Sequence, residues 1–211
     1  DAPSGNLLFP DLATDEPQQL LDGSARLALK ARGSGPQGAD ARFHRFIFIE
    51  RDADRCRQLE ALEAEFPDLA KDIRVEQGDA NAEIQKLCAK KWSGRRAVLF
   101  LDPYGMQVEW PTIEAIAKTK AIDLWLLFPL GIGVSRLLTR SGEIPKGWRT
   151  RLDKLLGTTN WYDDFYKVEH KADLFGNDEE RVVKATNETI ARYFNNRLKT
   201  IFPENGVAEP G

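Results

Sequence analysis

The chain has 211 residues, of which 42% are hydrophobic and 30% charged, a balance that excludes a disordered or fibrous protein. The chain has 30 Lys and Arg residues and 33 Asp and Glu residues, so its net charge is −3. This charge excludes a protein that coats nucleic acid through overall positive charge, but it allows a local basic patch. Two cysteines, Cys56 and Cys88, are too few for a disulfide framework and lack zinc-ligand spacing. We therefore expect core cysteines in a reducing, cytoplasmic compartment, with no metal site and no membrane span.

Residues 1–42 are rich in turn-forming residues and predict an irregular N-terminal segment. A helical pattern around Leu27 and Leu29 predicts one short helix within it. The glycine-rich stretch 33–40 predicts a flexible loop.

From residue 43 to residue 130, short apolar runs alternate with helical patterns. The predicted strands cover residues 46–50, 73–76, 97–101 and 122–128, and the predicted helices cover residues 53–66, 81–91 and 111–119. Strands that are apolar on both faces are typical of a parallel sheet covered on both sides. The alternation predicts an α/β fold with a doubly wound, mostly parallel, Rossmann-like sheet and right-handed crossovers.

After Pro129 the pattern becomes helical. Helices are predicted over residues 133–140, 147–156, 160–168 and 187–202. They form a helical extension, residues 131–203, that packs on the core, and residues 204–211 form a tail. The aromatic residues between positions 161 and 166 are assigned to core packing rather than to a stacking platform.

Acidic residues stand where three of the predicted strands end. Glu50 ends the first strand, Asp79 follows the second, and Asp102 follows the third. In open α/β sheets, ligands bind beyond the carboxyl ends of the strands. For a nucleoside ligand, a carboxylate at the first of these ends can accept both ribose hydroxyls, and the next can accept from an adenine amine. The alternative is that Glu50 and Asp79 are solvated strand-end or helix-capping residues.

The sequence Asp102-Pro103-Tyr104-Gly105 directly follows a predicted buried strand. An Asp followed by Pro and an aromatic residue can hold a planar amine, because the carboxylate and a carbonyl accept its N–H groups while the ring stacks on the base. A tight turn is an equally weighted alternative, since Asp, Pro and Gly all favour turns. Gly131-Ile132-Gly133 is interpreted as a loop, and the sequence contains neither a P-loop motif nor a Gly-x-Ser-x-Gly elbow.

Basic residues gather between positions 136 and 154, beside Trp148. The candidate contacts to nucleic-acid phosphates in this stretch are Arg136, Arg140, Arg149 and Arg151. The alternative is a solvated helix surface, because two glycine-containing turns interrupt the stretch.

Longer strings of the sequence resemble the three-Cys-motif partner (TcmP) proteins. They are FIFIERD, QGDAN, AVLFLDPYGMQVEW, KAIDLWLLFPLGIGVSRLL and GEIPKGWRTRLDKLLGTTNWYDDFY, and with LDGSARLAL they extend over most of the chain. The resemblance implies a class I S-adenosylmethionine (SAM)-dependent methyltransferase-like fold in a bacterial protein. It also implies a partner protein that carries a three-Cys, radical-SAM-like motif.

By the same resemblance, Glu50 would hold the cofactor ribose, and Asp79 and Ala80 would hold the adenine. Asp102, Pro103 and Tyr104 would occupy the acceptor position. The order Asp-Pro-Tyr-Gly departs from the Asp/Asn-Pro-Pro-Tyr/Phe of amino-methylating enzymes, which weakens a prediction of base N-methylation.

Members of that family begin with a strand and a glycine-rich DxFAGxG loop, neither of which precedes the stretch that opens on Asp1. We expect a fragment cut at both ends, since the closing strands expected after residue 203 are also absent. Two functions are compatible with these features. One is a SAM-dependent methyltransferase that acts on a nucleic acid or a nucleotide, and the other is a catalytically degenerate fold that binds the three-Cys partner or nucleic acid. A nicotinamide dehydrogenase is disfavoured, because no GxGxxG sequence follows a predicted strand.

Overall fold

The structure is a computed structural model that describes residues 23–34, 40–102, 106–172 and 178–202. It divides the chain into two compact units, a first unit of Asp1–Gly78 and a second unit of Asp79–Gly211. Each unit has its own elements and its own buried residues. The division falls inside the stretch 43–130, which the sequence analysis treats as one core.

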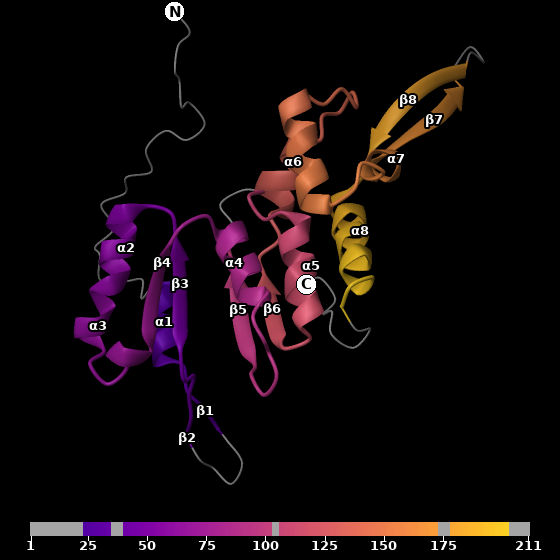
Figure 1. The fold of residues 1–211 in the computed structure, drawn as a ribbon. Helices are drawn as coiled ribbons and strands as arrows, with labels where there is room; N and C mark the ends of the chain where they lie inside the picture. The colour runs from indigo at the N-terminus through magenta and orange to yellow at the C-terminus, as the bar shows by residue number, and fades with distance from the viewer. Residues whose placement is uncertain (1–22, 35–39, 103–105, 173–177, 203–211) are drawn as a thin grey trace, which may run out of the picture. The chain divides into compact units, whose positions relative to one another are not determined.

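The first unit is built around a pair of parallel strands, β3 (Phe46–Glu50) and β4 (Ile73–Gln77). Helix α1 (Ser24–Lys30) packs on β3, and helix α2 (Ala53–Glu60) packs on both strands (Figure 1). The remaining elements of this unit are β1 (Gly33–Ser34), which pairs with β2 (Asp40–Ala41), α3 (Leu62–Glu65) and the 3-10 turn η2 (Ala70–Asp72). The predicted single helix 53–66 is therefore two short helices that meet at Ala61.

Leucine, isoleucine and phenylalanine side chains from β3, β4 and the helices and turn around them form the core of the first unit. Its buried members are Leu29, Phe46, Leu62, Leu69 and Ile73. Helix α2 begins where the sequence places a capping residue, since Asp52 accepts a hydrogen bond from the Arg55 backbone N–H at 2.9 Å. Burial of these apolar side chains is the main stabilising contribution in a unit of this size.

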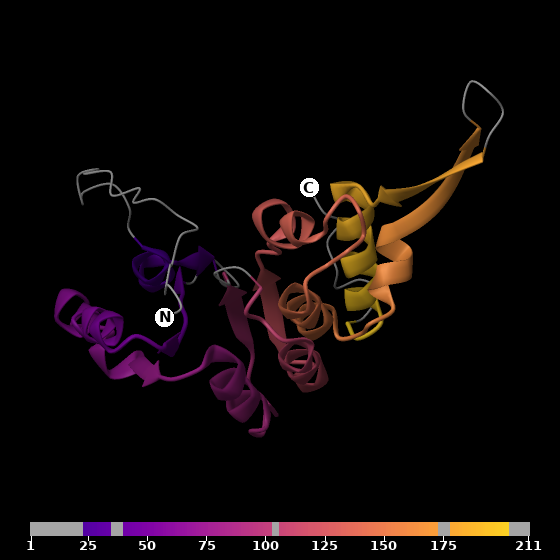
Figure 2. The same ribbon diagram turned by 90° about the horizontal axis from the view of Figure 1, so that it is seen from above.

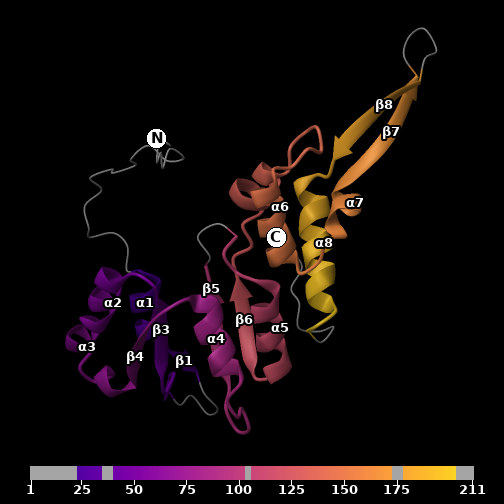
Figure 3. The same ribbon diagram turned by 45° about the horizontal axis from the view of Figure 1, so that its top comes forward.

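The second unit contains another pair of parallel strands, β5 (Ala97–Leu101) and β6 (Ile122–Leu126). Helices α4 (Ala80–Cys88) and α5 (Trp110–Thr119) lie side by side over one face of this pair (Figures 1 and 3). The unit continues with the π-type helical turn η3 (Leu130–Ser135), α6 (Lys146–Leu156), α7 (Trp161–Phe165), β7 (Tyr166–Ala172), β8 (Asp178–Lys184) and α8 (Asn187–Lys199). Its core is apolar and aromatic, with Ile113, Leu155, Trp161 and Phe165 fully buried.

An antiparallel hairpin replaces part of the helical extension predicted for residues 131–203. The helix predicted over 160–168 ends at Phe165, and the chain continues into the hairpin of β7 and β8, drawn in orange to yellow in Figure 2. The register of this pair sets Val168 opposite Val182. After Tyr166, the charged residues Lys167, Glu169 and Lys171 recur at every second position, a period of two that is typical of a strand. The aromatic residues that precede the hairpin are core residues, as predicted, because Trp161, Phe165 and Tyr166 are buried.

The mixed α/β class predicted from the sequence is confirmed. Within the described residues the strands pair only two by two, so each of β3, β4, β5 and β6 has one partner. Two-stranded pairs do not by themselves form the continuous, doubly wound sheet that the sequence predicts. None of the helices in the described ranges combines the length and the apolar character needed to cross a bilayer. Both cysteines are free, with Cys56 buried and Cys88 half-buried.

Candidate functional site

Glu50 stands at the carboxyl end of β3, where its side chain turns back onto the following loop. Its Oε1 atom accepts hydrogen bonds from the backbone N–H groups of Arg51 at 2.7 Å and Asp52 at 2.9 Å. Its Oε2 atom lies 4.0 Å from the Arg55 guanidinium, and the side chain is 26% exposed. The carboxylate is thus held in one orientation, with Oε2 still able to accept a hydroxyl from outside the unit.

Cys56 lies directly beneath Glu50, and its thiol donates to the Glu50 carbonyl oxygen at 3.4 Å. Burial raises the pKa of the Cys56 thiol, and the carboxylates of Glu50, Glu60 and Asp52 raise it further. The thiol therefore stays protonated at neutral pH and acts as a packing and hydrogen-bonding group rather than as a nucleophile.

Asp79 is the N-cap of α4, with Oδ1 accepting from the Ala82 backbone N–H at 3.1 Å. Ala80, the first residue of the helix, is exposed. The helix-capping alternative for Asp79 is therefore realised in the structure. A capping carboxylate still has a second oxygen, Oδ2, that can accept from a ligand.

Asn81, which the sequence analysis did not select, connects α4 to the loop that follows β5. Its amide donates to the Gln107 carbonyl oxygen at 2.8 Å, while its Oδ1 accepts from the Glu109 N–H at 3.0 Å and from the Thr112 hydroxyl at 2.9 Å. Gln85 donates to the Thr112 hydroxyl at 3.0 Å, and Thr112 is completely buried. This network fixes the loop downstream of Asp102 against the first turn of α4. The only sign of this role in the sequence is an Asn two residues after a helix-capping Asp, which by itself is a weak indication of a functional or bridging residue.

Asp102 directly follows the last residue of β5 and is exposed. Pro103 and Tyr104, the other two residues predicted for the acceptor position, lie outside the described residues. The loop resumes at Met106, whose Cγ would lie 3.6 Å from a Cβ added at Gly133. The loops that follow β5 and β6 are therefore in contact, and Gly131–Gly133 belongs to the helical turn η3 rather than to an open loop.

The three acids are divided between the two units. Glu50 belongs to the first unit, and Asp79 and Asp102 belong to the second. Each stands at or within two residues of the carboxyl end of a parallel strand. Gly78, the residue before Asp79, donates its N–H to the Glu50 carbonyl oxygen at 2.9 Å.

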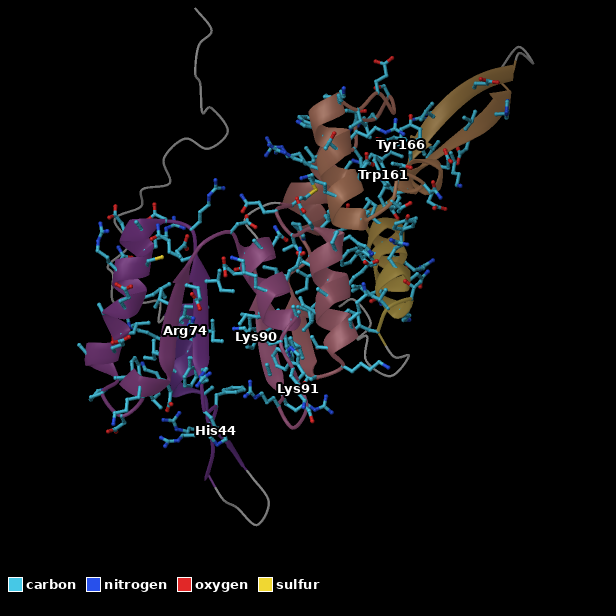
Figure 4. All side chains as sticks on the ribbon, viewed as in Figure 1. His44, Arg74, Lys90, Lys91, Trp161 and Tyr166 are labelled. Carbon is cyan, nitrogen blue, oxygen red and sulfur yellow. The ribbon has the colours of Figure 1, made fainter. Side chains whose placement is uncertain are left out.

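The four arginines selected as phosphate contacts have different surroundings in the second unit. The Arg149 guanidinium lies 4.8 Å from the Tyr162 ring centroid and 5.9 Å from that of Trp161. Trp161, labelled in Figure 4, donates to Asp153 at 2.7 Å. Arg149 thus contacts aromatic rings, although it is exposed like Arg136 and Arg151.

Arg140 lines an open pocket of about 890 Å³ at the base of the hairpin, together with Lys184, Glu169 and Glu180. Lys184 donates to the Ser135 carbonyl oxygen at 2.6 Å. Burial lowers the pKa of the Lys184 ammonium, and the positive charge of Arg140 lowers it further. The carboxylates of Glu169 and Glu180 would repel a phosphate, so this pocket is a weak candidate for phosphate binding despite Arg140 and Lys184.

A second basic cluster, which the sequence analysis did not select, lies at the amino ends of β5 and β6. It comprises Lys90, Lys91, Arg95, Arg96, Lys118 and Lys120, all exposed. The sequence contains this signal as the string KKWSGRR, which begins at the end of the predicted helix 81–91 and runs up to the predicted strand 97–101. No group of three His, Cys, Asp or Glu side chains within the described ranges is arranged to hold a metal ion.

Another exposed feature of the second unit is an apolar face on the β5–β6 pair. Phe100 and Trp125 are opposite each other in the register, are 65% and 66% exposed, and stack with centroids 6.1 Å apart. Leu127 follows them and is 65% exposed. Comparison of the chain with models of protein families, with curated proteins and with solved structures finds no match.

Proposed function

We propose that the chain is the core of a SAM-dependent methyltransferase-like protein of the three-Cys-motif partner type, acting on a nucleic acid or a nucleotide. In this proposal the β3–β4 and β5–β6 pairs are parts of one doubly wound sheet. Two facts support that assignment. Both pairs are parallel, and in each pair the two strands are consecutive and joined through helices, which is the construction of a βαβ unit.

The observation that carries the proposal is that Glu50, Asp79 and Asp102 each stand at or within two residues of the carboxyl end of a strand in a parallel pair. In open α/β sheets, ligands bind beyond the carboxyl ends of the strands. Two backbone N–H groups hold the Glu50 carboxylate in place. Such an anchored carboxylate needs little reorganisation on binding, so it is suited to accept hydroxyl groups.

The chemistry of these side chains suits the nucleoside part of SAM. Glu50 uses Oε1 for its own loop, so Oε2 would accept from a ribose hydroxyl. Asp79 uses Oδ1 for the helix cap, so Oδ2 would accept from the exocyclic amine of adenine. When bound, SAM would supply an electrophilic methyl group, and Asp102 would orient the acceptor by accepting its N–H or O–H group.

Isothermal titration calorimetry of the 211-residue chain with SAM, and separately with S-adenosylhomocysteine, tests the proposal. The informative variant is Glu50→Gln, because the amide oxygen can still accept from the backbone N–H groups while the charge is removed. Loss of one charge-assisted hydrogen bond is expected to weaken binding by about 1.5–3 kcal/mol, or roughly 10-fold to 150-fold.

Asp52→Asn is the matched control. It also removes one negative charge, two residues from Glu50, and Asn retains the N-cap hydrogen bond of α2. Its affinity for SAM should equal that of the unmodified chain. Absence of binding at millimolar SAM, or an equal loss in the control, would contradict the proposal.

The second candidate function is that of a catalytically degenerate fold that binds the three-Cys-motif protein. The observation that favours it is the exposed apolar face formed by Phe100, Trp125 and Leu127, because contiguous exposed aromatic side chains are typical of protein interfaces. Co-purification of the three-Cys-motif protein with the chain is expected to survive Trp148→Ser and to be lost with Trp125→Ser. Equal retention in both variants would remove the support for this function.

A further inference from the structure

The basic cluster at the amino ends of β5 and β6 has the composition of a polyanion-binding surface. Its side chains come from two segments, the loop between α4 and β5 and the carboxyl end of α5 with its C-cap residue. They are Lys90, Lys91, Arg95, Arg96, Lys118 and Lys120. No acidic residue occurs between positions 84 and 101 or between positions 115 and 122. Figure 4 labels Lys90 and Lys91 in this part of the second unit.

Contacts within the second unit hold the two basic segments together. The Arg96 guanidinium donates to the Lys120 carbonyl oxygen at 2.9 Å, and the Ala97 N–H donates to the Ala121 carbonyl oxygen at 3.0 Å. Gly94 closes the first segment into a turn at a φ of 71°, a conformation that glycine adopts without strain. Six positive charges are therefore presented by a braced surface rather than by a mobile tail.

The two helix ends at this site do not account for the charge. Cations stabilise the carboxyl ends of helices, and both α4 and α5 end here. Each end carries only about half a negative charge, so the two together balance roughly one of the six cations. Among the described residues, no carboxylate forms an ion pair with any of the six. This excess of unbalanced positive charge favours an external anion.

An open pocket of about 630 Å³ lies within the cluster and is lined by Trp92, Ser93, Arg95, Arg96 and Lys120 among others. Ser93 is exposed and offers a hydroxyl donor to a phosphate oxygen at this pocket. Basic groups beside an aromatic ring and a hydroxyl are typical of a groove that follows a nucleic-acid backbone.

We propose that this surface, residues 90–96 with residues 118–120, binds the phosphodiester backbone of a nucleic acid. It lies at the amino ends of the strands, away from the edge where Asp102 stands. It is also separate from Arg136, Arg140, Arg149 and Arg151. The inference does not depend on methyl transfer, because backbone binding requires no cofactor.

Fluorescence anisotropy with a fluorescein-labelled 20-mer, as a single strand and as a duplex, tests the inference without added SAM. The test variant is Lys90→Gln/Lys91→Gln/Arg95→Gln, which leaves the Arg96 contact intact. The matched control, Arg57→Gln/Lys71→Gln/Arg192→Gln, removes three exposed positive charges elsewhere. The test variant should bind at least about tenfold more weakly, and its slope of log K against log salt should be shallower by about 2–3, while the control binds as the unmodified chain does.

Lys90→Arg/Lys91→Arg should retain binding, because it preserves the charges. Near-ultraviolet circular dichroism of each variant checks that the aromatic packing is intact. The inference is overturned if the unmodified chain binds neither oligonucleotide at 20–50 mM salt, or if the test variant and the control lose binding equally. It is also overturned if Arg136→Gln/Arg151→Gln abolishes binding that the test variant retains, or if the chain binds phosphatidylserine vesicles but no oligonucleotide.

Discussion

Gly157 closes α6 at a position where the structure leaves no space for a side chain. The residue has a φ of 66°, in the left-handed region, and forms the C-cap of the helix. A Cβ added there would lie 2.6 Å from the Trp110 Cβ and closer still to its Cγ and Cδ1. We therefore expect Gly157→Ala to destabilise the second unit through both the backbone conformation and the clash.

The magnitude depends on whether Trp110 can move aside. Trp110 is only 4% exposed, its indole N–H donates to Glu114 at 2.9 Å, and the Arg197 guanidinium lies 4.5 Å from its ring centroid. Trp110 is thus held on several sides. A left-handed alanine costs about 1–2 kcal/mol and overpacking about 1–3 kcal/mol, so the expected loss is about 2–5 kcal/mol.

Urea denaturation followed by tryptophan fluorescence measures this loss in the relevant unit, because all five tryptophans, at positions 92, 110, 125, 148 and 161, belong to the second unit. The control is Gly147→Ala in the same helix, where an added Cβ meets nothing within 4 Å. This control should stabilise by about 0.5–1 kcal/mol. Gly157→Asn separates the two causes, since Asn tolerates the left-handed region but carries the clashing Cβ. If Gly157→Ala lies within about 0.5 kcal/mol of the unmodified chain, the steric reasoning is refuted.

Three further predictions concern polar and titrating groups. Asn81→Ala should lower the free energy of unfolding of the second unit by about 2–3 kcal/mol in the same urea assay, because it leaves the Glu109 N–H without its acceptor. The control, Ala82→Ser at an exposed position, should change the free energy of unfolding little. Cys56 should react with iodoacetamide more slowly in the folded chain than in the denatured chain, because its folded-state pKa is raised. For the same reason, the contribution of the protonated thiol to the free energy of unfolding is complete below about pH 8–9 and is lost as the pH rises through the folded-state pKa. Alkylation at equal rates in both states would contradict this prediction. Arg140→Gln should raise the pKa of Lys184 toward its ordinary value, observed by NMR titration of the side chain, and an unchanged titration would exclude the electrostatic cause.

The parallel strands could be predicted from the sequence because their signal is local. The run Ala97–Leu101 contains only apolar residues before Asp102, and the structure gives the same bounds for β5. Pro111 likewise marks the first turn of α5, and Asp79 marks the start of α4. Each of these signals lies within a few residues of the element that it specifies.

The hairpin has a weaker local signal, charged residues at every second position after Tyr166, and this signal does not fix where the preceding helix ends. Trp161, Phe165 and Tyr166 have helical spacing, and their burial is equally compatible with a longer helix. The helix ends where β7 begins to pair with β8, whose paired residues are 6–18 positions apart in the sequence, with Tyr166 opposite Lys184 at the far end. Pairing of this kind depends on tertiary context more than on local propensity.

The candidate site also contains some features that local sequence predicts and others that only the fold creates. Glu50, Asp79 and Asp102 could be placed at strand ends from the sequence, because strand ends are local features. The cross-links made by Asn81 join residues 26–31 positions apart, and no pattern in one sequence specifies them. The basic cluster also depends on the fold, since Lys118 and Lys120 join Lys90 and Arg95 only when β5 and β6 pair.

The β7–β8 hairpin bears on self-association of the chain, because its strand edges can pair with another copy. Within the described residues, each of the two strands pairs on one side only, so two rows of backbone N–H and C=O groups are left without a partner strand, and Val168 and Val182 add an exposed apolar pair. Such edges favour pairing with another chain. The opposite face carries charged side chains, among them Glu169 and Arg181. A second strand could add to either edge only in a register that avoids placing like charges opposite each other, and this restriction weakens as salt screens the charges.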